Sequence, residues 1–217
     1  HARGSERGRA DHTRMKGPLY VVTDPEAALP VPDQVRAAAK GGARIIQIRD
    51  KTAPDARIAA LVHALLPEMA ALGVCLIVND RVEVALAVGA HGLHIGQGDG
   101  DPVAIRRRLP PGMILGLSIE TEAQARHVPP CVDYAGVGPV RATPTKPDHA
   151  APIGFAGLAR ITALLPMPSY AIGGIRPGDA AALRGAGAVG MAVVSAVTRA
   201  ADPVAAARAL IEEWNTP

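Results

Sequence analysis

The sequence predicts a single α/β domain that folds as a closed (β/α)8 TIM barrel. Eight short apolar runs are each followed by a segment with helical spacing, and this alternation is typical of a parallel sheet. Eight such units in a chain of 217 residues favour a closed barrel, with a doubly wound open sheet as the alternative. Polar residues recur where the apolar runs end. A barrel would bring all of those ends to one face, whereas an open sheet would spread them along an edge.

The first half of the chain contains four strand–helix units. Asp33 is expected to cap the first helix, and Gly41 is expected to stop it. Apolar residues at helical spacing, such as Leu61 and Leu65, define the second helix. The predicted strands are 19–24, 44–50, 74–78 and 92–95, and the predicted helices are 33–40, 54–72, 82–88 and 102–109.

The second half contains four more units, with a long loop at 139–152 between the sixth strand and its helix. Asp202 is expected to cap the last helix, with Pro203 in its first turn. The predicted strands are 114–118, 133–138, 170–174 and 189–194, and the predicted helices are 120–128, a segment that ends at residue 165, 177–185 and 203–214.

The composition favours a globular domain with a core of small aliphatic side chains. Hydrophobic residues make up 48% of the chain, but aromatic residues make up only 2%. The core is therefore expected to consist of Ala, Val, Ile and Leu, which suit helices packed closely on a parallel sheet.

The positive charge is concentrated at the N-terminus. Residues 1–16 contain five basic and two acidic residues, which accounts for the formal net charge of +3, so the rest of the chain is neutral. Together with the scarcity of aromatic residues that could stack on bases, this disfavours a nucleic-acid surface. Residues 1–16 are predicted to be a disordered extension, or residues foreign to the natural protein with Met15 as its start. The catalytic domain would then span residues 17–217.

The cysteines and the hydropathy pattern favour a cytoplasmic protein. Cys75 and Cys131 lack a CxxC spacing, which indicates reduced thiols, and Cys75 is expected to be a small core residue. No apolar run reaches the ~18 residues that a membrane span needs, and the N-terminus lacks the apolar region of a secretory signal. We expect small-molecule partners, no nucleic acid and no membrane. Oligomeric state is left open, homo-oligomers included.

The segment from Ile45 to Lys51 begins as a buried strand and ends with polar residues. Gln47, Arg49 and Lys51 are spaced by two residues and therefore share one face of the strand. Two cations on one face of an otherwise apolar strand are unfavourable unless an anion lies beside them. This pattern predicts a polyanion site at the C-terminal end of the strand. An exposed, solvated strand face is the simpler alternative.

Carboxylates follow the next two strands, at Asn79-Asp80 and at Asp99. Two carboxylates in one barrel mouth repel each other unless a cation joins them. Mg²⁺ needs only one or two protein carboxylates, because phosphate oxygens and water complete its octahedron. The alternatives are that Asp80 caps a helix starting at Arg81 and that Asp99 is an ordinary turn residue.

The loop after the sixth strand is long and polar, and it contains Thr143, Thr145 and Lys146. Long loops in compact barrels are usually functional, and these hydroxyls and this ammonium could hold a phosphorylated ligand. By itself the pattern is weak, because Thr and Pro are ordinary loop residues.

Gly173-Gly174 after the seventh strand and Val194-Ser195 after the eighth lie where many barrels bind a phosphate. Glycine lets the backbone approach the phosphate, and a short helix after Ser195 could direct N–H groups toward it. Plain turns are the alternative.

His94 lies in the fourth predicted strand and is expected to be a hydrogen-bonded core histidine rather than a catalytic residue. The chain has no GxSxG or HExxH motif and no GxGxxG at its first strand–helix turn. These absences disfavour the corresponding hydrolases, zinc proteases and dinucleotide-binding proteins.

Taken in order, these motifs resemble those of the thiamine-phosphate synthase family. The resemblance runs from residue 19 to the residues after Ser195, and Arg141-Ala142 before Thr143 departs from the usual pattern. The motifs are Gln47-x-Arg49-x-Lys51, Asn79-Asp80, His94-x-Gly96-Gln97-x-Asp99, Ser118, Thr143-Pro144-Thr145-Lys146, Gly173-Gly174-Ile175 and Val194-Ser195.

The resemblance implies a Mg²⁺-dependent transferase of thiamine biosynthesis. Such an enzyme joins 4-amino-2-methyl-5-hydroxymethylpyrimidine diphosphate to thiazole phosphate and releases pyrophosphate. The metal would be bound by Asp80 and Asp99. The pyrimidine diphosphate would be held by Gln47, Arg49, Lys51, Asn79, Ser118 and Lys146, with Ser118, Lys146, Arg49 and Lys51 as the catalytic residues. The thiazole phosphate would be held by Thr143, Thr145, Gly174, Val194 and Ser195.

Two other functions compete with this one: a thiazole tautomerase-like isomerase and a phosphate-binding barrel without catalysis. Proteins with either function would lack the residues that bind a diphosphate. This chain has those residues, which favours the synthase. Arg49, Lys51, Lys146 and a metal could neutralise a diphosphate leaving group. No good protein nucleophile or base lies between the two anion sites, which fits departure of the leaving group before the thiazole nitrogen attacks.

Overall fold

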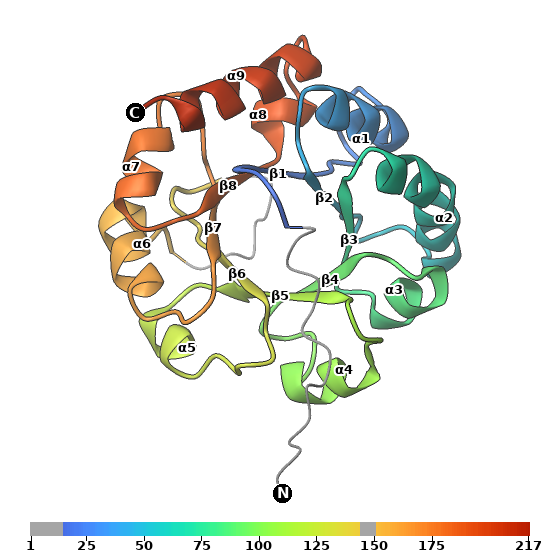
Figure 1. Ribbon diagram of the computed structural model, residues 1–217, viewed down its shortest axis with the longest axis horizontal. Helices are drawn as coiled ribbons and strands as arrows, with labels where there is room; N and C mark the ends of the chain where they lie inside the picture. Colours follow the sequence, from blue (N-terminus) through green and yellow to red (C-terminus); the bar gives the residue numbers. More distant parts are fainter. Residues whose placement is uncertain (1–14, 144–150) are drawn as a thin grey trace, which may run out of the picture.

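The computed structural model describes residues 15–143 and 151–217 and shows a closed barrel of eight parallel strands (Figure 1). The strands are β1 (Leu19–Val22), β2 (Ile45–Ile48), β3 (Cys75–Asn79), β4 (Gly92–Ile95), β5 (Ile114–Ile119), β6 (Tyr134–Val137), β7 (Ser169–Ile172) and β8 (Gly190–Val193). Each strand pairs with its neighbour in sequence, and β8 closes the ring by pairing with β1. The predicted TIM barrel is confirmed, and the open sheet is excluded.

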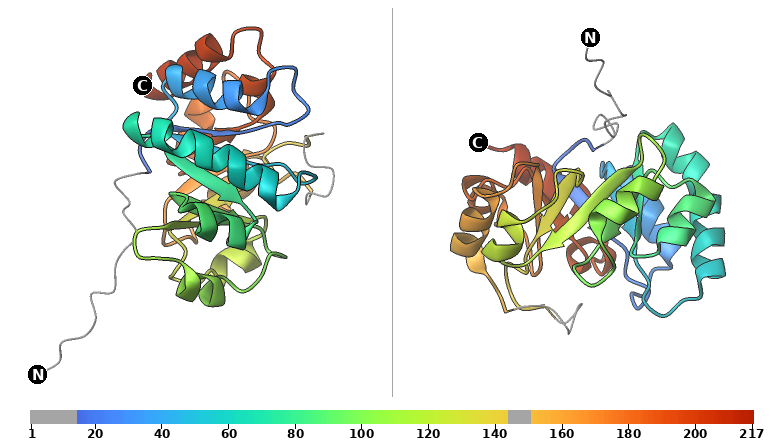
Figure 2. Two further views of the ribbon diagram at one scale, coloured as in Figure 1. Left: turned by 90° about the vertical axis from the view of Figure 1, so that its right-hand side faces the viewer. Right: turned by 90° about the horizontal axis from the view of Figure 1, so that it is seen from below.

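Helices surround the ring of strands in Figure 1, and the side views in Figure 2 show them packed along its outside. They are α1 (Val31–Lys40), α2 (Asp55–Ala71), α3 (Val82–Val88), α4 (Pro102–Arg108), α5 (Glu122–Arg126), α6 (Gly154–Thr162), α7 (Ala180–Gly185), α8 (Ser195–Thr198) and α9 (Pro203–Asn215). The short helix expected after the eighth strand is present as α8.

Asp202 caps α9 as predicted, because its carboxylate accepts a hydrogen bond from the Ala205 N–H at 3.0 Å. The prediction that Asp33 caps the first helix was wrong. The helix begins at Val31, with Pro32 in its first turn, where no intrahelical N–H bond is needed. Asp33 therefore lies inside that turn, where its charge is still favourable at the positive end of the helix dipole.

Alternating side chains along the strands separate two layers of core. In β1, Leu19 and Val21 belong to the layer between the strands and the helices, whereas Tyr20 and Val22 belong to the barrel interior. The outer layer is built of aliphatic residues, as the composition predicts. The interior is different, because it holds Tyr20, Tyr134 and Tyr170, all three tyrosines of the chain. The prediction of an aliphatic core was therefore wrong for this layer.

Glycines on neighbouring strands make room for these rings. Gly116 on β5 lies opposite Tyr134 on β6, and a Cβ at Gly116 would overlap the tyrosine ring. Gly190 on β8 lies opposite Tyr170 on β7, and a Cβ there would lie 2.6 Å from the ring. Each tyrosine thus fills the space left by a missing side chain on the next strand, which keeps the interior closely packed.

Cys75 and Cys131 are not joined in a disulfide, and Cys75 is buried in the barrel interior as predicted. Within the described part of the chain, no helix combines the length and the apolar character that crossing a bilayer requires. Of the predicted extension, residues 1–14 lie outside the described residues. Met15 packs against the interior cluster.

Candidate active site

The C-terminal ends of the strands surround a cavity of about 170 Å³. Most of the residues predicted for the site line it, so the strand ends converge as expected. Asp80 follows β3 without contributing to the lining, and Thr145 and Lys146 lie outside the described residues. The predicted residues in the lining are Gln47, Arg49, Lys51, Asn79, Asp99, Ser118, Thr143, Gly174, Val194 and Ser195.

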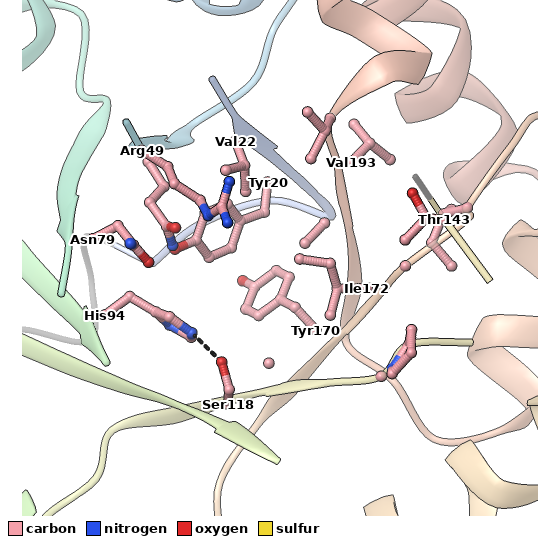
Figure 3. A pocket seen from close by; sticks show the side chains of 18 of the residues that line it. Tyr20, Val22, Arg49, Asn79, His94, Ser118, Thr143, Tyr170, Ile172 and Val193 are labelled. Atoms are coloured by element: carbon pink, nitrogen blue, oxygen red, sulfur yellow. Dashed lines mark hydrogen bonds between the residues drawn. The ribbon is translucent and has the colours of Figure 1, made fainter. Parts of the chain in front are cut away.

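One side of the cavity is lined by polar side chains. Arg49, Asn79, His94 and Ser118 lie together on this side in Figure 3, across from Thr143. They come from the ends of β2 to β5, so four consecutive strands build the polar side.

The backbone of Arg49 is anchored where β1 and β2 end. Its N–H donates to the Thr23 hydroxyl at 3.0 Å, which links the two strand ends. Among residues 15–143 and 151–217, no carboxylate forms an ion pair with the Arg49 guanidinium. No described carboxylate therefore neutralises the charge of Arg49, which can bind an anionic ligand.

Lys51 lies in a turn that Asp50 shapes. The Asp50 carboxylate accepts hydrogen bonds from the N–H groups of Thr52 and Ala53, both at 2.9 Å. Partial burial opposes ionisation of Asp50, but these hydrogen bonds outweigh that effect and lower its pKa. The turn directs the Lys51 ammonium to the Asp80 carboxylate, with which it forms an ion pair. The predicted cation is thus paired with a predicted metal ligand.

Asp80 has an unusual backbone conformation. Its φ of 51° is positive, the only such value for a non-glycine residue in the described part of the chain, and such strain is concentrated at functional sites. The conformation is held by its N–H, which donates to the His94 carbonyl at 2.8 Å. The alternative that Asp80 caps the following helix is not supported, since α3 begins at Val82 without a side-chain cap.

The Asp99 side chain folds back to the end of β4, the strand next to the one that precedes Asp80. Its carboxylate accepts a hydrogen bond from the Gly96 N–H at 2.6 Å, just beyond β4. Because Asn79 pairs with His94 in the β3–β4 register, Asp80 and Gly96 belong to adjacent strand ends. Two carboxylates at adjacent strand ends, one of them already paired with a cation, are a donor set that suits Mg²⁺.

The other side of the cavity includes half-buried backbone from the loop after β7. Gly173 and Gly174 have φ values of 95° and 65°, a region that favours glycine. A Cβ at Gly173 would lie 2.5 Å from the Pro139 side chain, and one at Gly174 would lie 2.7 Å from that of Arg141. Glycine is therefore required both by the backbone conformation and by the close approach of the loop after β6.

Arg141 joins these two loops. Its guanidinium donates to both carboxylate oxygens of Asp179, at 2.5 and 2.8 Å, and to the Gly174 carbonyl at 3.0 Å. It also lies over the Phe155 ring, 5.0 Å from the centroid. Burial of Asp179 opposes its ionisation, but the bonds from Arg141 and from the Arg176 N–H outweigh burial and lower its pKa. Arg141, one of the two unusual residues before Thr143, thus forms an ion pair that connects the loop after β6 to the loop after β7.

The loop after β8 runs directly into α8, which begins at Ser195. Arg199 follows this helix and donates to the Asp24 carboxylate at 2.7 Å. Asp24 is a polar strand-end residue that is almost fully buried and does not line the cavity. It connects the β1 loop to the end of α8 instead of facing a ligand.

A hydrogen-bonded group of side chains in the cavity wall was not predicted from the sequence. Tyr20 bonds to Gln47 and Tyr134, and His94 bonds to Tyr134 and Ser118. His94 is therefore buried and hydrogen-bonded through both ring nitrogens, as expected of a core histidine. The tyrosines could have been found from strand parity, since Tyr134 lies two residues before Gly136 and Gly136 lines the cavity.

Comparison with known proteins identifies relatives over nearly the whole barrel. A family profile described as thiamine monophosphate synthase matches residues 19–197. A thiamine-phosphate synthase of Roseiflexus castenholzii is 47% identical over 200 residues, covering 91% of this chain and 88% of the relative. One of Xanthobacter autotrophicus is 49% identical over 198 residues, covering 88% and 92%.

Solved structures agree with these matches. A thiamine phosphate pyrophosphorylase from Pyrococcus furiosus superimposes with a TM-score of 0.84 at 34% identity, covering 93% of this chain and 96% of that one. A 3-hexulose-6-phosphate synthase superimposes with a TM-score of 0.67 over 90% of this chain and 99% of that one. At 19% identity, the second likeness concerns the fold alone.

Proposed function

Because the chain belongs to the thiamine monophosphate synthase family, we propose that it makes thiamine phosphate. It would join 4-amino-2-methyl-5-hydroxymethylpyrimidine diphosphate to thiazole phosphate and release pyrophosphate. The observation that carries this function is one cavity with two unlike sides. Cationic and polar side chains line one side, and a glycine-rich loop lines the other.

The pyrimidine diphosphate is assigned to the polar side. Gln47, Asn79 and Ser118 supply hydrogen-bonding groups, and Arg49 and Lys51 supply positive charge. Lys146 is proposed to add a third cation and lies outside the described residues. Together these groups would neutralise charge that develops on the departing diphosphate, which is the task of Ser118, Lys146, Arg49 and Lys51 as catalytic residues.

The thiazole phosphate is assigned to the opposite side. Gly174, Val194 and Ser195 line the cavity there, and Thr143 lies in the neighbouring loop. Thr145 is proposed to belong to the same group and lies outside the described residues. Fixed backbone and hydroxyl groups can bind a phosphate that takes no part in the bond changes, which suits a positioning site.

Asp80 and Asp99 are proposed to hold Mg²⁺. This proposal is supported by their carboxylates, which belong to adjacent strand ends, and by the pairing of Asp80 with the positive charge of Lys51. When bound, the metal would shield the negative charge of the diphosphate. Lys51 would then be released from Asp80 to contact the same diphosphate.

The proposed reaction needs position and charge more than a protein nucleophile. The electron-rich aminopyrimidine can stabilise a methylene cation after the diphosphate leaves, and the thiazole nitrogen then attacks that carbon. The C–O bond to the diphosphate breaks, a C–N bond forms, and the thiazole ends as the thiazolium. The two sides of the cavity would hold the reacting atoms together.

A thiazole tautomerase-like isomerase and a phosphate-binding barrel without catalysis remain the competing functions. Both would need only the glycine-rich side of the cavity. The cations Arg49 and Lys51 and the carboxylate Asp99 in the cavity wall favour the synthase.

The deciding experiment is a coupled assay for pyrophosphate with both substrates present, after chelation and stepwise return of Mg²⁺. The synthase predicts pyrophosphate and thiamine phosphate in equal amounts, both dependent on the metal. An isomerase would change the thiazole without releasing pyrophosphate, and a binding protein would change neither substrate. Mn²⁺ binding followed by electron paramagnetic resonance should weaken in Asp80→Asn, which tests the metal site apart from turnover.

The cellular setting is proposed from the same chemistry. Both substrates are small phosphorylated molecules, and two cysteines that form no disulfide suit a reducing compartment. We propose a cytoplasmic enzyme that acts without nucleic acid or membrane. The number of subunits stays open, a homo-oligomer is one of the options, and measurements in solution decide it.

A further inference from the structure

A chain of four hydrogen bonds crosses the barrel interior in the wall of the cavity. The Gln47 amide nitrogen lies 2.6 Å from the Tyr20 hydroxyl, which lies 2.7 Å from that of Tyr134. The Tyr134 hydroxyl lies 2.8 Å from Nδ1 of His94, and Nε2 of His94 lies 2.9 Å from Oγ of Ser118. The last of these bonds is drawn in Figure 3. The chain runs from Gln47 on β2 to Ser118 on β5, and all five of its residues line the cavity.

With the amide nitrogen of Gln47 toward Tyr20, the chain has only one direction in which every bond has a donor. An amide nitrogen can only donate, so Tyr20 accepts from Gln47 and must turn its own proton toward Tyr134. Tyr134 then donates to Nδ1 of His94, which places the imidazole proton on Nε2. His94 therefore donates to Ser118, and the Ser118 hydroxyl proton is left for the cavity.

The opposite direction would need the Gln47 amide to turn over. Tyr20, Tyr134, Gln47 and His94 are all buried, so each polar group depends on its partner in the chain. With the amide nitrogen of Gln47 toward Tyr20, reversing the chain would place the Tyr20 proton against the amide protons, with two donors facing each other. Burial also raises the pKa of both Tyr20 and Tyr134, so both hydroxyls keep their protons.

We propose that Tyr20, Tyr134 and His94 are positioning residues that hold Ser118 as a hydrogen-bond donor toward the cavity. A serine hydroxyl alone could donate or accept, but a serine that already accepts from His94 presents its proton. The site thereby selects a substrate group that accepts a hydrogen bond and disfavours one that only donates. This inference rests on the proposed function, in which the pyrimidine diphosphate offers acceptors in its ring nitrogens and its diphosphate oxygens.

Tyr134→Phe and Tyr170→Phe form a matched pair of variants. Tyr170 packs against the rings of Tyr20 and Tyr134, with centroids 5.6 and 6.0 Å away, but its hydroxyl faces the Gly17 carbonyl at 3.4 Å. Each variant removes one hydroxyl from the same aromatic cluster, and only Tyr134→Phe interrupts the chain.

Tyr134→Phe should lower kcat/KM for the pyrimidine diphosphate by about tenfold, the effect of one lost hydrogen bond in the transition state. KM for thiazole phosphate should stay unchanged. Tyr170→Phe should remain within about twofold of the unaltered protein, since its hydroxyl makes only a long bond. Equal losses in the two variants would mean that only packing matters and would overturn the proposal.

A double-mutant cycle tests whether Tyr134 acts through Ser118. If it does, Tyr134→Phe should have little further effect once Ser118→Ala is present. The same fold-loss in both backgrounds would show that Tyr134 acts independently of Ser118, which contradicts the proposed chain.

The tautomer of His94 provides a readout that does not depend on activity. Nitrogen-15 NMR of the substrate-free protein should show neutral His94 with its proton on Nε2, assigned by comparison with His94→Gln. A proton on Nδ1 would overturn the proposed direction even if thiamine phosphate is formed. The expected tautomer without pyrophosphate release would instead count against the proposed function alone.

His94→Gln and His94→Leu separate polarity from volume. A glutamine can accept from Tyr134 through its carbonyl and donate to Ser118 through its amide, whereas leucine can do neither. We expect His94→Gln to retain clearly more kcat than His94→Leu. Equal loss in the two variants would count against a polarity role.

Discussion

The two sides of the barrel mouth are built in different ways. From β2 to β5 the cavity is lined by charged and polar side chains such as Arg49 and Asn79. On the β7 side it includes the glycine backbone at Gly173 and Gly174, against which the loop after β6 packs closely. A diphosphate that leaves needs positive charge placed where negative charge develops, whereas a phosphate that is only held needs groups that position it. Changes on the first side should therefore impair chemistry, and changes on the second should impair binding together with local folding.

The largest effect is expected from Arg49→Ala on the polar side. Loss of this charge should lower kcat/KM by about 10²–10³-fold, as for other groups that stabilise a developing charge. The melting temperature should hardly change, because the strand end is fixed by the Arg49 backbone bond to Thr23. Steady-state kinetics and thermal unfolding measure both. Arg36→Ala on α1, where Arg36 pairs with Glu68 at the surface, is the control. Normal turnover in Arg49→Ala would remove Arg49 from the site.

Gly173→Ala should harm the opposite side through its backbone. Its positive φ of 95° and the 2.5 Å approach to Pro139 should cost about 1–3 kcal/mol in stability. They should also weaken thiazole-phosphate binding by about tenfold or more. Gly178→Ala is the matched control, because Gly178 has the same φ but no atom within 4 Å of the added Cβ. Calorimetry of thiazole-phosphate binding that gives equal losses for both variants would contradict a role for the close loop contact.

Asp99→Asn should sharpen the metal assignment on the polar side. Asparagine can still accept the hydrogen bond from the Gly96 N–H, so the loop should keep its shape while one anionic ligand is lost. We expect a fall in turnover of about tenfold at low Mg²⁺, with part of it restored at higher concentration. Turnover is titrated against Mg²⁺ beside thiazole-phosphate affinity, which should survive. Undiminished turnover at low Mg²⁺ would mean that Asp99 is not a ligand.

The smallest effect is expected from Arg141→Met, which removes the connection between the loops after β6 and β7. Losing its hydrogen bonds to Asp179 should cost about 1–2 kcal/mol at neutral pH and should raise KM for thiazole phosphate severalfold. Because the pKa of Asp179 is lowered in the folded state, the stabilisation is present above the ordinary aspartate pKa of about 3.9. It is lost as pH falls, so the stability difference should narrow in acid.

Arg106→Met is the matched control for that prediction. Arg106 pairs with Asp133, which precedes β6, and so lies at the opposite end of the barrel from the mouth. The control should lose stability without any change in KM. Urea unfolding at neutral and acid pH, beside steady-state kinetics, distinguishes the two pairs. A change of the same size in KM for thiazole phosphate in Arg106→Met would argue against a specific role of the Arg141–Asp179 pair.

Much of the site followed from local patterns. The period of two in Gln47-x-Arg49-x-Lys51 predicted a shared face, and all three residues line the cavity. Gly173-Gly174 was predicted to need glycine, and both residues adopt a positive φ that favours glycine; their approach to a phosphate stays a prediction. Such predictions succeed because strand geometry and glycine conformation depend on neighbouring residues alone.

Other features depend on residues that are far apart in the chain. Tyr20 and Tyr134 share a hydrogen bond across 114 positions, and Arg141 meets Asp179 across 38. No local pattern predicts such pairs, because their distance is set by closure of the barrel and by strand register. The prediction of an aliphatic core failed in the barrel interior for the same reason. Composition gives the number of aromatic residues but not their positions in the fold.

The sequence by itself determined the alternation of strands and helices, the shared face of Gln47, Arg49 and Lys51, and the family. Hydrophobic periodicity and backbone preference are local properties, so they can be read residue by residue. Only the tertiary structure decided that Lys51 pairs with Asp80 and that Arg199 pairs with Asp24. It also decided that Tyr20, Tyr134 and His94 connect Gln47 to Ser118. Hydrogen bonds and ion pairs act over a few ångströms, and only the closed barrel brings these partners within that range.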